Sequence, residues 1–298
     1  MKNIAKIFIV LFLLTQVTIS AQEKRISFKK GVLKICSSKN FQIEGYDGKE
    51  VIIKGLFDSK ENIFFTNTYK TLKNLNFQGK VEILSSYSSN DKNRTKGLKK
   101  LGKDSNNGLF LRIEQKNNQL IVSDKIRDNI FVMLSDESYK IMIPNTLKLI
   151  WDTQRCKEKP EEEFHKEIHF YNSKTSSLSY FKGEVEISTS LKNLKLKDVT
   201  GPVSINSLGG NIKIIFDKTS PKKLYSVYTN NGYIDITLSQ SSNILIDAKA
   251  SEIYSNLEFK ILEDKEVNDL QEMKLKLNTG RVKMKLNTGI GSIYLRKD

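Results

Sequence analysis

The chain has 298 residues and a mass of 34.2 kDa, which is enough for one large domain or two ordinary ones. Hydrophobic residues make up 38%, and 15 Phe and 11 Tyr argue against a disordered chain. With 4 Pro, 2 Cys and 2 His, the composition excludes collagen-like and disulfide-dense proteins and leaves little material for zinc sites or histidine-based catalysis.

The first 21 residues have the composition of a secretory signal peptide. Lys2 and Lys6 form a positive start, and residues 7–14 are an unbroken apolar run. We expect cleavage between Ala21 and Gln22, which places the mature chain in the periplasm or on the cell surface. The run is too short for a membrane span of about 20 residues, although an uncleaved anchor is the alternative, and no later stretch predicts a transmembrane segment.

Beyond the signal peptide, apolar and polar residues alternate, and helical periodicity is nearly absent. This pattern predicts an all-β protein built from short strands, each with one buried face. Two weak helical candidates are residues 92–102 and 161–165. The clearest expected strands are 51–53, 81–83, 109–113, 120–122, 185–187, 194–196, 203–205, 212–214, 234–236, 244–246, 282–284 and 293–295.

A repeated pattern of glycine, any residue, apolar, polar, apolar marks many of these strands. Glycine permits the positive φ angle of a sharp corner, and the Asn or Thr that often precedes it can satisfy the turn backbone. The pattern predicts a β-solenoid, or β-helix-like stack, in which each coil buries its apolar residues against its neighbours. Ordinary hairpins in a β-sandwich are the alternative. The glycines are Gly183, Gly201, Gly210, Gly232, Gly280 and Gly291.

The pattern divides the chain into three parts after the signal peptide. Residues 22–155 are a strand-rich region with long loops, residues 156–174 are a polar connection, and residues 175–298 are the glycine-paced solenoid region. One continuous solenoid through both halves is the alternative. Cys36 and Cys156 lie 120 residues apart, so a disulfide is chemically permitted after export, but two separate buried thiols are the favoured interpretation.

Several sequence segments, and the order in which they occur, resemble the bacterial "putative adhesin" family of exported proteins of unknown function. They are residues 41–54, with the sequence FQIEGYDGKEVIIK, then 97–101 with 107–109, 139–144 with 147–149, and 199–206. The resemblance covers most of the mature chain. It implies a predicted β-solenoid, an envelope or surface location and non-catalytic binding, and it carries over no catalytic residue.

Few residues are arranged for catalysis or metal binding. On a strand, the side chains of His165, Glu167 and His169 would share one face. Their spacing is not that of a zinc protease, so we interpret the segment as a solvated charged strand. No nucleophile elbow or phosphate-binding loop is present in the sequence. Asp235 and Asp247 are a carboxylate pair that could in principle face one another across a solenoid groove, as in glycoside hydrolases, but alternating outward-facing polar residues explain them more simply. We therefore expect no cofactor, no metal and no enzymatic activity.

The net charge of +15 has two explanations. The first is binding to anionic envelope polymers, such as lipopolysaccharide phosphates or acidic glycans, and the second is a basic composition spread over solvated strand faces. Single lysines between apolar residues favour the second. The expected outward lysines are Lys192, Lys195, Lys197 and Lys213.

Tyrosines near these lysines could present an aromatic surface to sugars or to a protein partner, although cross-strand packing is the more common role. The candidate binding tyrosines are Tyr225, Tyr228 and Tyr233. The sequence thus favours a non-enzymatic, adhesin-like binding or structural module of the envelope or cell surface. Its partner would be an anionic polymer or another envelope protein, and nucleic acid is not expected. A polysaccharide lyase or hydrolase on a solenoid is the alternative.

Overall fold

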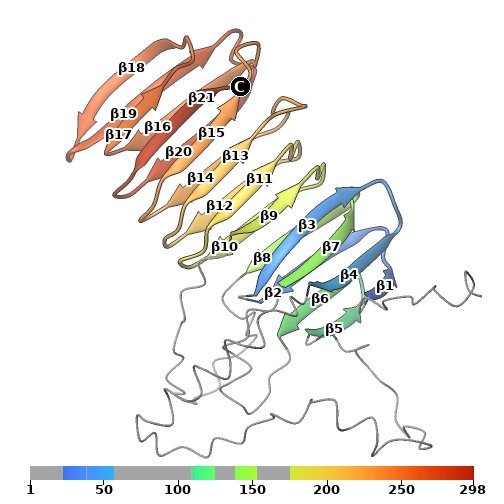
Figure 1. The fold of residues 1–298 in the computed structure, drawn as a ribbon. Helices are drawn as coiled ribbons and strands as arrows, with labels where there is room; N and C mark the ends of the chain where they lie inside the picture. The colour runs from blue at the N-terminus through green and yellow to red at the C-terminus, as the bar shows by residue number, and fades with distance from the viewer. Residues whose placement is uncertain (1–22, 38, 57–108, 110, 125–137, 153–174) are drawn as a thin grey trace, which may run out of the picture.

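The computed structural model describes residues 23–37, 39–56, 109, 111–124, 138–152 and 175–298. Every regular element of these residues is a β-strand, which confirms the all-β expectation for this part of the chain (Figure 1). The same residues contain no helix that is long and apolar enough to cross a membrane. Outside them lie the cleavage site at Ala21 and Gln22, the expected strand at 81–83 and both expected helical segments.

The strands form two mixed sheets that face each other. Sheet A has ten strands. In spatial order they are β1 (Glu23–Ser27), β4 (Glu50–Leu56), β7 (Ser138–Pro144), β3 (Asn40–Tyr46), β9 (Ser176–Ser179), β11 (Leu194–Lys197), β13 (Ile212–Ile215), β15 (Ile234–Leu238), β21 (Ser292–Lys297) and β17 (Glu252–Ser255).

Sheet B has eleven strands. In spatial order they are β5 (Leu111–Lys116), β6 (Gln119–Asp124), β2 (Gly31–Cys36), β8 (Leu147–Asp152), β10 (Val185–Thr189), β12 (Val203–Ser207), β14 (Tyr225–Thr229), β20 (Val282–Thr288), β16 (Ile244–Ala250), β19 (Leu270–Leu277) and β18 (Lys260–Val267).

Between β9 and β15 the chain alternates between the two sheets, one strand at a time. Each strand from β9 to β13 therefore pairs in parallel with the strand two elements later, and equivalent residues lie side by side. In sheet B, Val185 is beside Val203, and Val203 is beside Tyr225. Because parallel register places like residues in rows, a single alternating sequence pattern buries the same row in every strand. Figure 1 shows the result as a long two-layered stack.

The core lies between the two sheets and consists of the inward row of each strand. Leu178, Leu196, Ile214, Ile236 and Leu295 form one such row in sheet A, and all are buried. The alternation of apolar and polar residues in the sequence therefore has the predicted cause. The expected strands that fall in the described residues all overlap with observed strands.

The glycine pattern reflects close contact between stacked turns. A Cβ atom at Gly232 would lie 2.3 Å from the carbonyl oxygen of Gly210, and a Cβ atom at Gly291 would lie 1.9 Å from that of Gly232. Gly232 also has a φ of 147°, which L-residues rarely adopt. Only glycine fits at these corners because each turn rests directly on the carbonyl of the turn beneath it.

Buried hydroxyl groups satisfy the polar atoms of the same corners. Ser207 Oγ donates a hydrogen bond to the Gly209 carbonyl at 2.5 Å, and Thr288 Oγ1 donates one to the Gly291 carbonyl at 2.7 Å. These side chains belong to one inward row of sheet B. Since buried carbonyls need donors, the hydroxyl groups of Ser207 and Thr288 are part of the construction of these corners. The full row is Thr189, Ser207, Thr229 and Thr288. Thr229 Oγ1 donates to the Gly210 carbonyl at 3.3 Å, whereas Thr189 Oγ1 has no hydrogen-bond partner among the described residues.

The strand order does not follow the chain at either end of the stack. Strand β3 lies between β7 and β9, and β2 lies between β6 and β8. Both sheets also continue across the connection expected at 156–174, because β3 pairs with β9 and β8 pairs with β10. The described strands before and after this segment therefore share the same two sheets.

Cys36 is the last residue of β2 and is disulfide-bonded. This corrects the favoured interpretation of two separate thiols. The chain has only one other cysteine, Cys156, which lies outside the described residues. Alternation could not reveal the bond, because a disulfide depends on the spatial distance between two cysteines, which a local sequence pattern does not determine.

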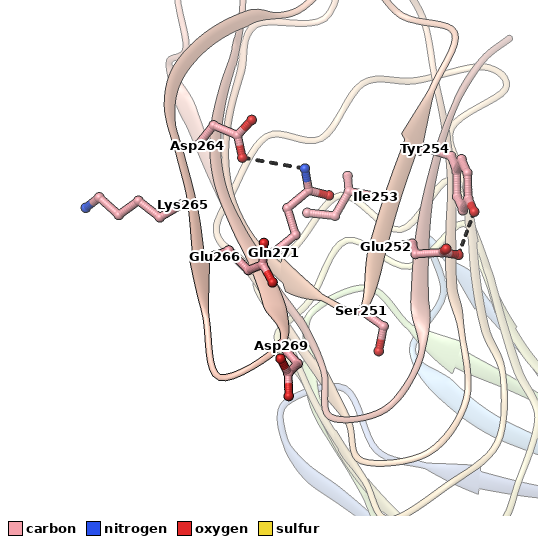
Figure 2. Close-up of a pocket in the computed structure, with 9 residues that line it drawn as sticks. All are labelled: Ser251, Glu252, Ile253, Tyr254, Asp264, Lys265, Glu266, Asp269 and Gln271. Carbon is pink, nitrogen blue, oxygen red and sulfur yellow. Dashed lines mark hydrogen bonds between the residues drawn. The ribbon is translucent and has the colours of Figure 1, made fainter.

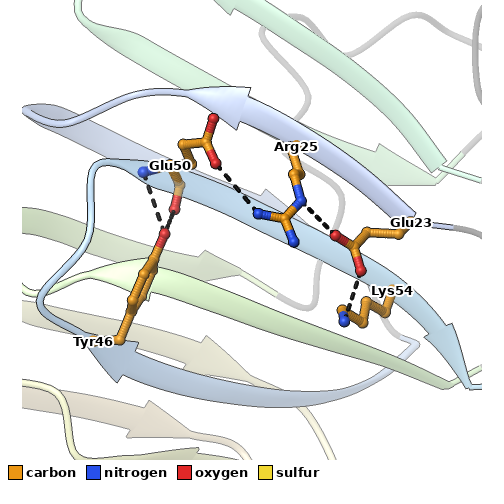
Figure 3. Close-up of polar contacts among 5 residues, drawn as sticks. All are labelled: Glu23, Arg25, Tyr46, Glu50 and Lys54. Carbon is orange, nitrogen blue, oxygen red and sulfur yellow. Dashed lines mark hydrogen bonds and ion pairs between the residues drawn. The ribbon is translucent and has the colours of Figure 1, made fainter.

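Polar contacts tie β1 to its neighbour at the N-terminal end of sheet A (Figure 3). Glu23 accepts from Lys54 Nζ at 2.6 Å and from Arg25 Nε at 2.6 Å, and Arg25 also contacts Glu50 at 3.6 Å. Lys54, and then Arg25, hold the pKa of the Glu23 carboxyl below its usual value. Tyr46 donates its hydroxyl hydrogen to the Glu50 carbonyl at 2.5 Å. The outer face of β1 is thus joined to β4 by charged groups.

Candidate binding surfaces

Two of the expected outward lysines lie on the outer face of sheet A. Lys195 of β11 and Lys213 of β13 are exposed neighbours in the parallel register. Lys197, two residues further along β11, forms an ion pair with Asp217 at 2.8 Å, and this contact raises the pKa of its ammonium group. The charge of Lys197 is therefore partly compensated, whereas Lys195 and Lys213 face solvent together.

Lys192 is not an outward lysine, which corrects the expectation for this residue. It is 4% exposed, and its Nζ atom donates to the carbonyl oxygen of Lys39 at 2.6 Å. Burial lowers the pKa of its ammonium group to about 8, while the nearby carboxylate of Asp124 opposes the shift. Lys192 precedes β11, so it belongs to a turn, where the alternation of a strand does not decide the side-chain direction.

The three candidate tyrosines do not form one surface. Tyr225 is fully buried in the inward row of β14, and its hydroxyl group donates to the Val199 carbonyl, which corrects its assignment as a binding residue. Burial raises the pKa of this hydroxyl. Tyr228 is exposed on the outer face of sheet B, whereas Tyr233 is exposed beside β15 of sheet A.

Tyr233 instead joins two other tyrosines at the C-terminal end of sheet A. The rings of Tyr233 and Tyr294 meet edge to face with centroids 5.9 Å apart, and Tyr254 stacks on Tyr294 at 5.4 Å. Arg296 lies 5.4 Å from the centroid of the Tyr294 ring. Tyr254, at the end of this tyrosine cluster, is 48% exposed. The sequence analysis missed Tyr294, because only the pairing of β15, β21 and β17 brings these rings together.

Charged groups surround the tyrosine cluster. Arg296 Nε donates to Asp235 Oδ1 at 2.9 Å, and Tyr254 donates its hydroxyl hydrogen to Glu252 at 2.5 Å. The hydrogen bond to Glu252 raises the pKa of the Tyr254 hydroxyl. The cluster therefore combines exposed aromatic surface with groups that donate and accept hydrogen bonds.

A groove of about 600 Å³ opens beside the same cluster, between β17 and the β18–β19 hairpin (Figure 2). We call it the C-terminal groove. Carboxylates dominate its lining, and Figure 2 shows the one lining lysine, Lys265, pointing away from it. The lining residues are Ser251, Glu252, Ile253, Tyr254, Asp264, Lys265, Glu266, Asp269 and Gln271.

The carboxylate pair considered for glycoside hydrolysis is separated in the structure. Asp235 lies on β15 of sheet A and is held by Arg296, whereas Asp247 is exposed on β16 of sheet B. The two residues therefore do not face each other across a groove, and the simpler interpretation, polar residues on outer strand faces, describes them. Alternation showed that both were polar positions but could not show that they belonged to different sheets.

The described residues contain no group of three or more His, Cys, Asp or Glu side chains that could hold a metal ion. The cluster of His165, Glu167 and His169 lies outside them. These observations direct attention to the tyrosine cluster, the neighbouring lysines and the C-terminal groove.

No protein-family model and no curated protein matches the sequence. Two solved structures of adhesion-related proteins resemble the chain. A "putative cell adhesion protein" from Clostridium sporogenes is 13% identical in sequence, with a TM-score of 0.39. The match covers 94% of the present chain and 100% of the Clostridium chain. A "putative adhesin" from Bacteroides fragilis is 9% identical, with a TM-score of 0.26, and the match covers 92% of the present chain and 95% of the Bacteroides chain. The adhesin family that the sequence resembles bears the same kind of name.

Proposed function

We propose that the chain is an exported, non-enzymatic β-solenoid module of the bacterial envelope or cell surface that binds an anionic polysaccharide. The signal-peptide composition of residues 1–21 supports export. The parallel register of β9 to β15 and the glycine corners stacked on one another support a solenoid.

The observation that carries the proposal is a row of side chains across the outer face of sheet A. In register order the row contains Lys195, Lys213, Asp235, Tyr294 and Tyr254. Adjacent strands lie about 4.8 Å apart, so this row spans about 19 Å along the stack. A linear polymer lying along the stack axis would meet two ammonium groups and then two aromatic rings.

The chemistry of the row suits an acidic sugar chain. The ammonium groups of Lys195 and Lys213 attract carboxylate or sulfate groups, and a tyrosine ring offers an apolar face to a sugar ring. The one acidic member of the row, Asp235, is compensated by Arg296 at 2.9 Å. Because the row runs across the outer face of a sheet, it binds along the polymer and does not enclose a single bond for cleavage.

Calorimetry with alginate, a polyuronate, tests the proposal, with neutral dextran as the control polymer. Lys195→Gln combined with Lys213→Gln, and separately Tyr254→Ala, should each weaken alginate binding at least tenfold. Matched variants on the outer face of sheet B, Lys34→Gln with Lys285→Gln and Tyr228→Ala, should not. Binding should also weaken as salt rises from 0.1 M to 1 M, because the Debye length falls from about 10 Å to about 3 Å.

Equal losses for both sets of variants, or no alginate binding at low salt, would refute the proposal. The enzymatic alternative has its own readout, the length of the alginate chains after prolonged incubation with the protein. Chains that keep their length agree with a binding module. Shortened chains would establish the lyase or hydrolase alternative and remove the non-enzymatic part of the proposal.

A further inference from the structure

The two sheets end unevenly at the C-terminal end of the stack. Sheet A ends at β17, which follows β16 in the chain, whereas sheet B continues past β16 with two more strands, β19 and β18. The β18–β19 hairpin therefore extends beyond the last strand of sheet A. Figure 1 shows it at the end of the stack opposite to β1.

The inner face of this hairpin is only partly covered. Two inward rows continue from β16 into the hairpin. One passes through Leu275 of β19 to Ile261 of β18, and the other passes through Met273 of β19 to Asp264 of β18. Leu275 is buried, but Ile261 is 56% exposed although it lies on the inward side. An additional strand of sheet A would cover this apolar side chain.

Strand β17 offers a place for such a strand. It pairs with β21 on one side, and in the described part of the chain no strand pairs with its other edge. Unpaired backbone N–H and C=O groups at a sheet edge are a template for an added extended segment. The C-terminal groove, of about 600 Å³, lies along this edge.

The charge of the groove selects the occupant. Asp264 and Glu266 belong to the inward side of β18, and Asp269 lies on the same groove. The carboxylates of these three residues form an acidic site on a chain whose net charge is +15, whereas the fourth lining carboxylate, that of Glu252, accepts the Tyr254 hydroxyl hydrogen on the outer side of β17. An added strand with Lys or Arg at its inward positions would bring cations opposite these groups, whereas a strand with acidic residues would be repelled.

We propose that the C-terminal groove binds a cationic, extended peptide segment of a partner protein, which pairs with β17 as an additional strand of sheet A and lies over the β18–β19 hairpin. The site is separate from the row of lysines and tyrosines proposed to bind polysaccharide. Only Tyr254 borders both the groove and the row, so variants at other residues distinguish the two sites.

Fluorescence polarisation with labelled eight-residue peptides tests the inference on the full mature chain. The binding peptide alternates Thr and Lys. In the first control peptide Pro replaces every Thr, which keeps the charge but prevents strand pairing, and in the second Glu replaces every Lys. We expect the Thr–Lys peptide to bind at least tenfold more tightly than either control.

Variants of the protein test the position of the site. Asp264→Asn with Glu266→Gln should weaken binding of the Thr–Lys peptide at least tenfold. Asp247→Asn with Glu258→Gln removes the same amount of charge outside the groove and should leave binding within twofold. Alginate binding should be unchanged in both, which separates a failure of this inference from a failure of the proposed function.

Hydrogen exchange adds a readout of strand pairing, since the peptide should slow exchange of backbone amides in β17. Three results would overturn the inference. They are equal binding of the Thr–Lys and Pro–Lys peptides, equal effects of the two pairs of variants, and no binding of the Thr–Lys peptide at 0.1 M salt, where screening acts over about 10 Å.

Discussion

Replacing Lys192 by Met should change how the stability of the protein depends on pH. In the folded chain the pKa of Lys192 is about 8, against 10.5 for the unperturbed group. Between these values the unfolded chain holds a proton that the folded chain has released. The free energy of unfolding of the wild type therefore rises with pH in this window, by up to about 1.4 kcal/mol per pH unit.

The whole window corresponds to about 3 kcal/mol, because each unit of pKa difference is worth about 1.4 kcal/mol. Below pH 8 both states are protonated and Lys192 adds no slope. Lys192→Met lacks the titrating group. The difference in unfolding free energy, variant minus wild type, should thus stay constant up to about pH 8 and then fall by about 3 kcal/mol as the pH approaches 10.5.

Urea unfolding at pH 7 to 10.5 measures this difference. Its constant part includes the hydrogen bond that the Lys39 carbonyl loses, which costs about 1–3 kcal/mol, so the test is the slope and not the offset. Lys213→Met, at an exposed position, is the matched control and should give a curve parallel to that of the wild type. A parallel curve for Lys192→Met as well would show that Lys192 is not buried as a charged group.

Four further substitutions probe the stack. Asp198→Ala should lower the free energy of unfolding by about 3 kcal/mol, because its carboxylate accepts hydrogen bonds from the backbone N–H groups of residues 217–219 at 3.0–3.1 Å; a loss below 1 kcal/mol in urea unfolding would contradict this. Ile212→Asp or Ile234→Asp, each placing a carboxylate in a fully buried row, should cost at least about 3 kcal/mol, and wild-type melting temperatures would show that the row is not buried. Gly291→Ala should lower the melting temperature because its Cβ would meet the Gly232 carbonyl, and unchanged melting would show that the corners are not in contact.

The local part of the fold could be predicted from the sequence because it depends on local pattern. Alternation located strands such as β10, β12 and β13 from a few residues each, since one face of every strand is buried. The glycine pattern predicted the corners, but the expected reason, a positive φ, applies only to Gly210, Gly232 and Gly280 of the six glycines; Gly183, Gly201 and Gly291 are needed because a Cβ atom would meet a backbone carbonyl. In β14, Tyr225 and Tyr228 occupy opposite faces. Tyr225 shares its face with Val227, so alternation within the strand indicates that Tyr225 is the inward one, and naming both as surface residues overlooked this pattern.

Features that depend on distant residues could not be predicted. The tyrosine cluster requires β15, β21 and β17 to be neighbours, although β17 precedes β21 in the chain. The C-terminal groove exists because sheet B continues with two strands beyond β16, whereas sheet A ends at β17. Lys192 is buried because its side chain reaches the Lys39 carbonyl, and no spacing within the sequence relates these two residues.

The position of β2 and β3 within the sheets affects how the chain can fold while it is being made or exported. These strands emerge first, yet their neighbours β8 and β9 end at Asp152 and Ser179. More than a hundred residues must therefore appear before β2 and β3 have these neighbours, and closing so long a loop is slow. From β9 to β15, each new strand pairs with the strand two elements before it. Pairing in that region can follow the order of synthesis, whereas β2 and β3 keep unpaired edges for longer, and such edges are exposed to chaperones or to aggregation.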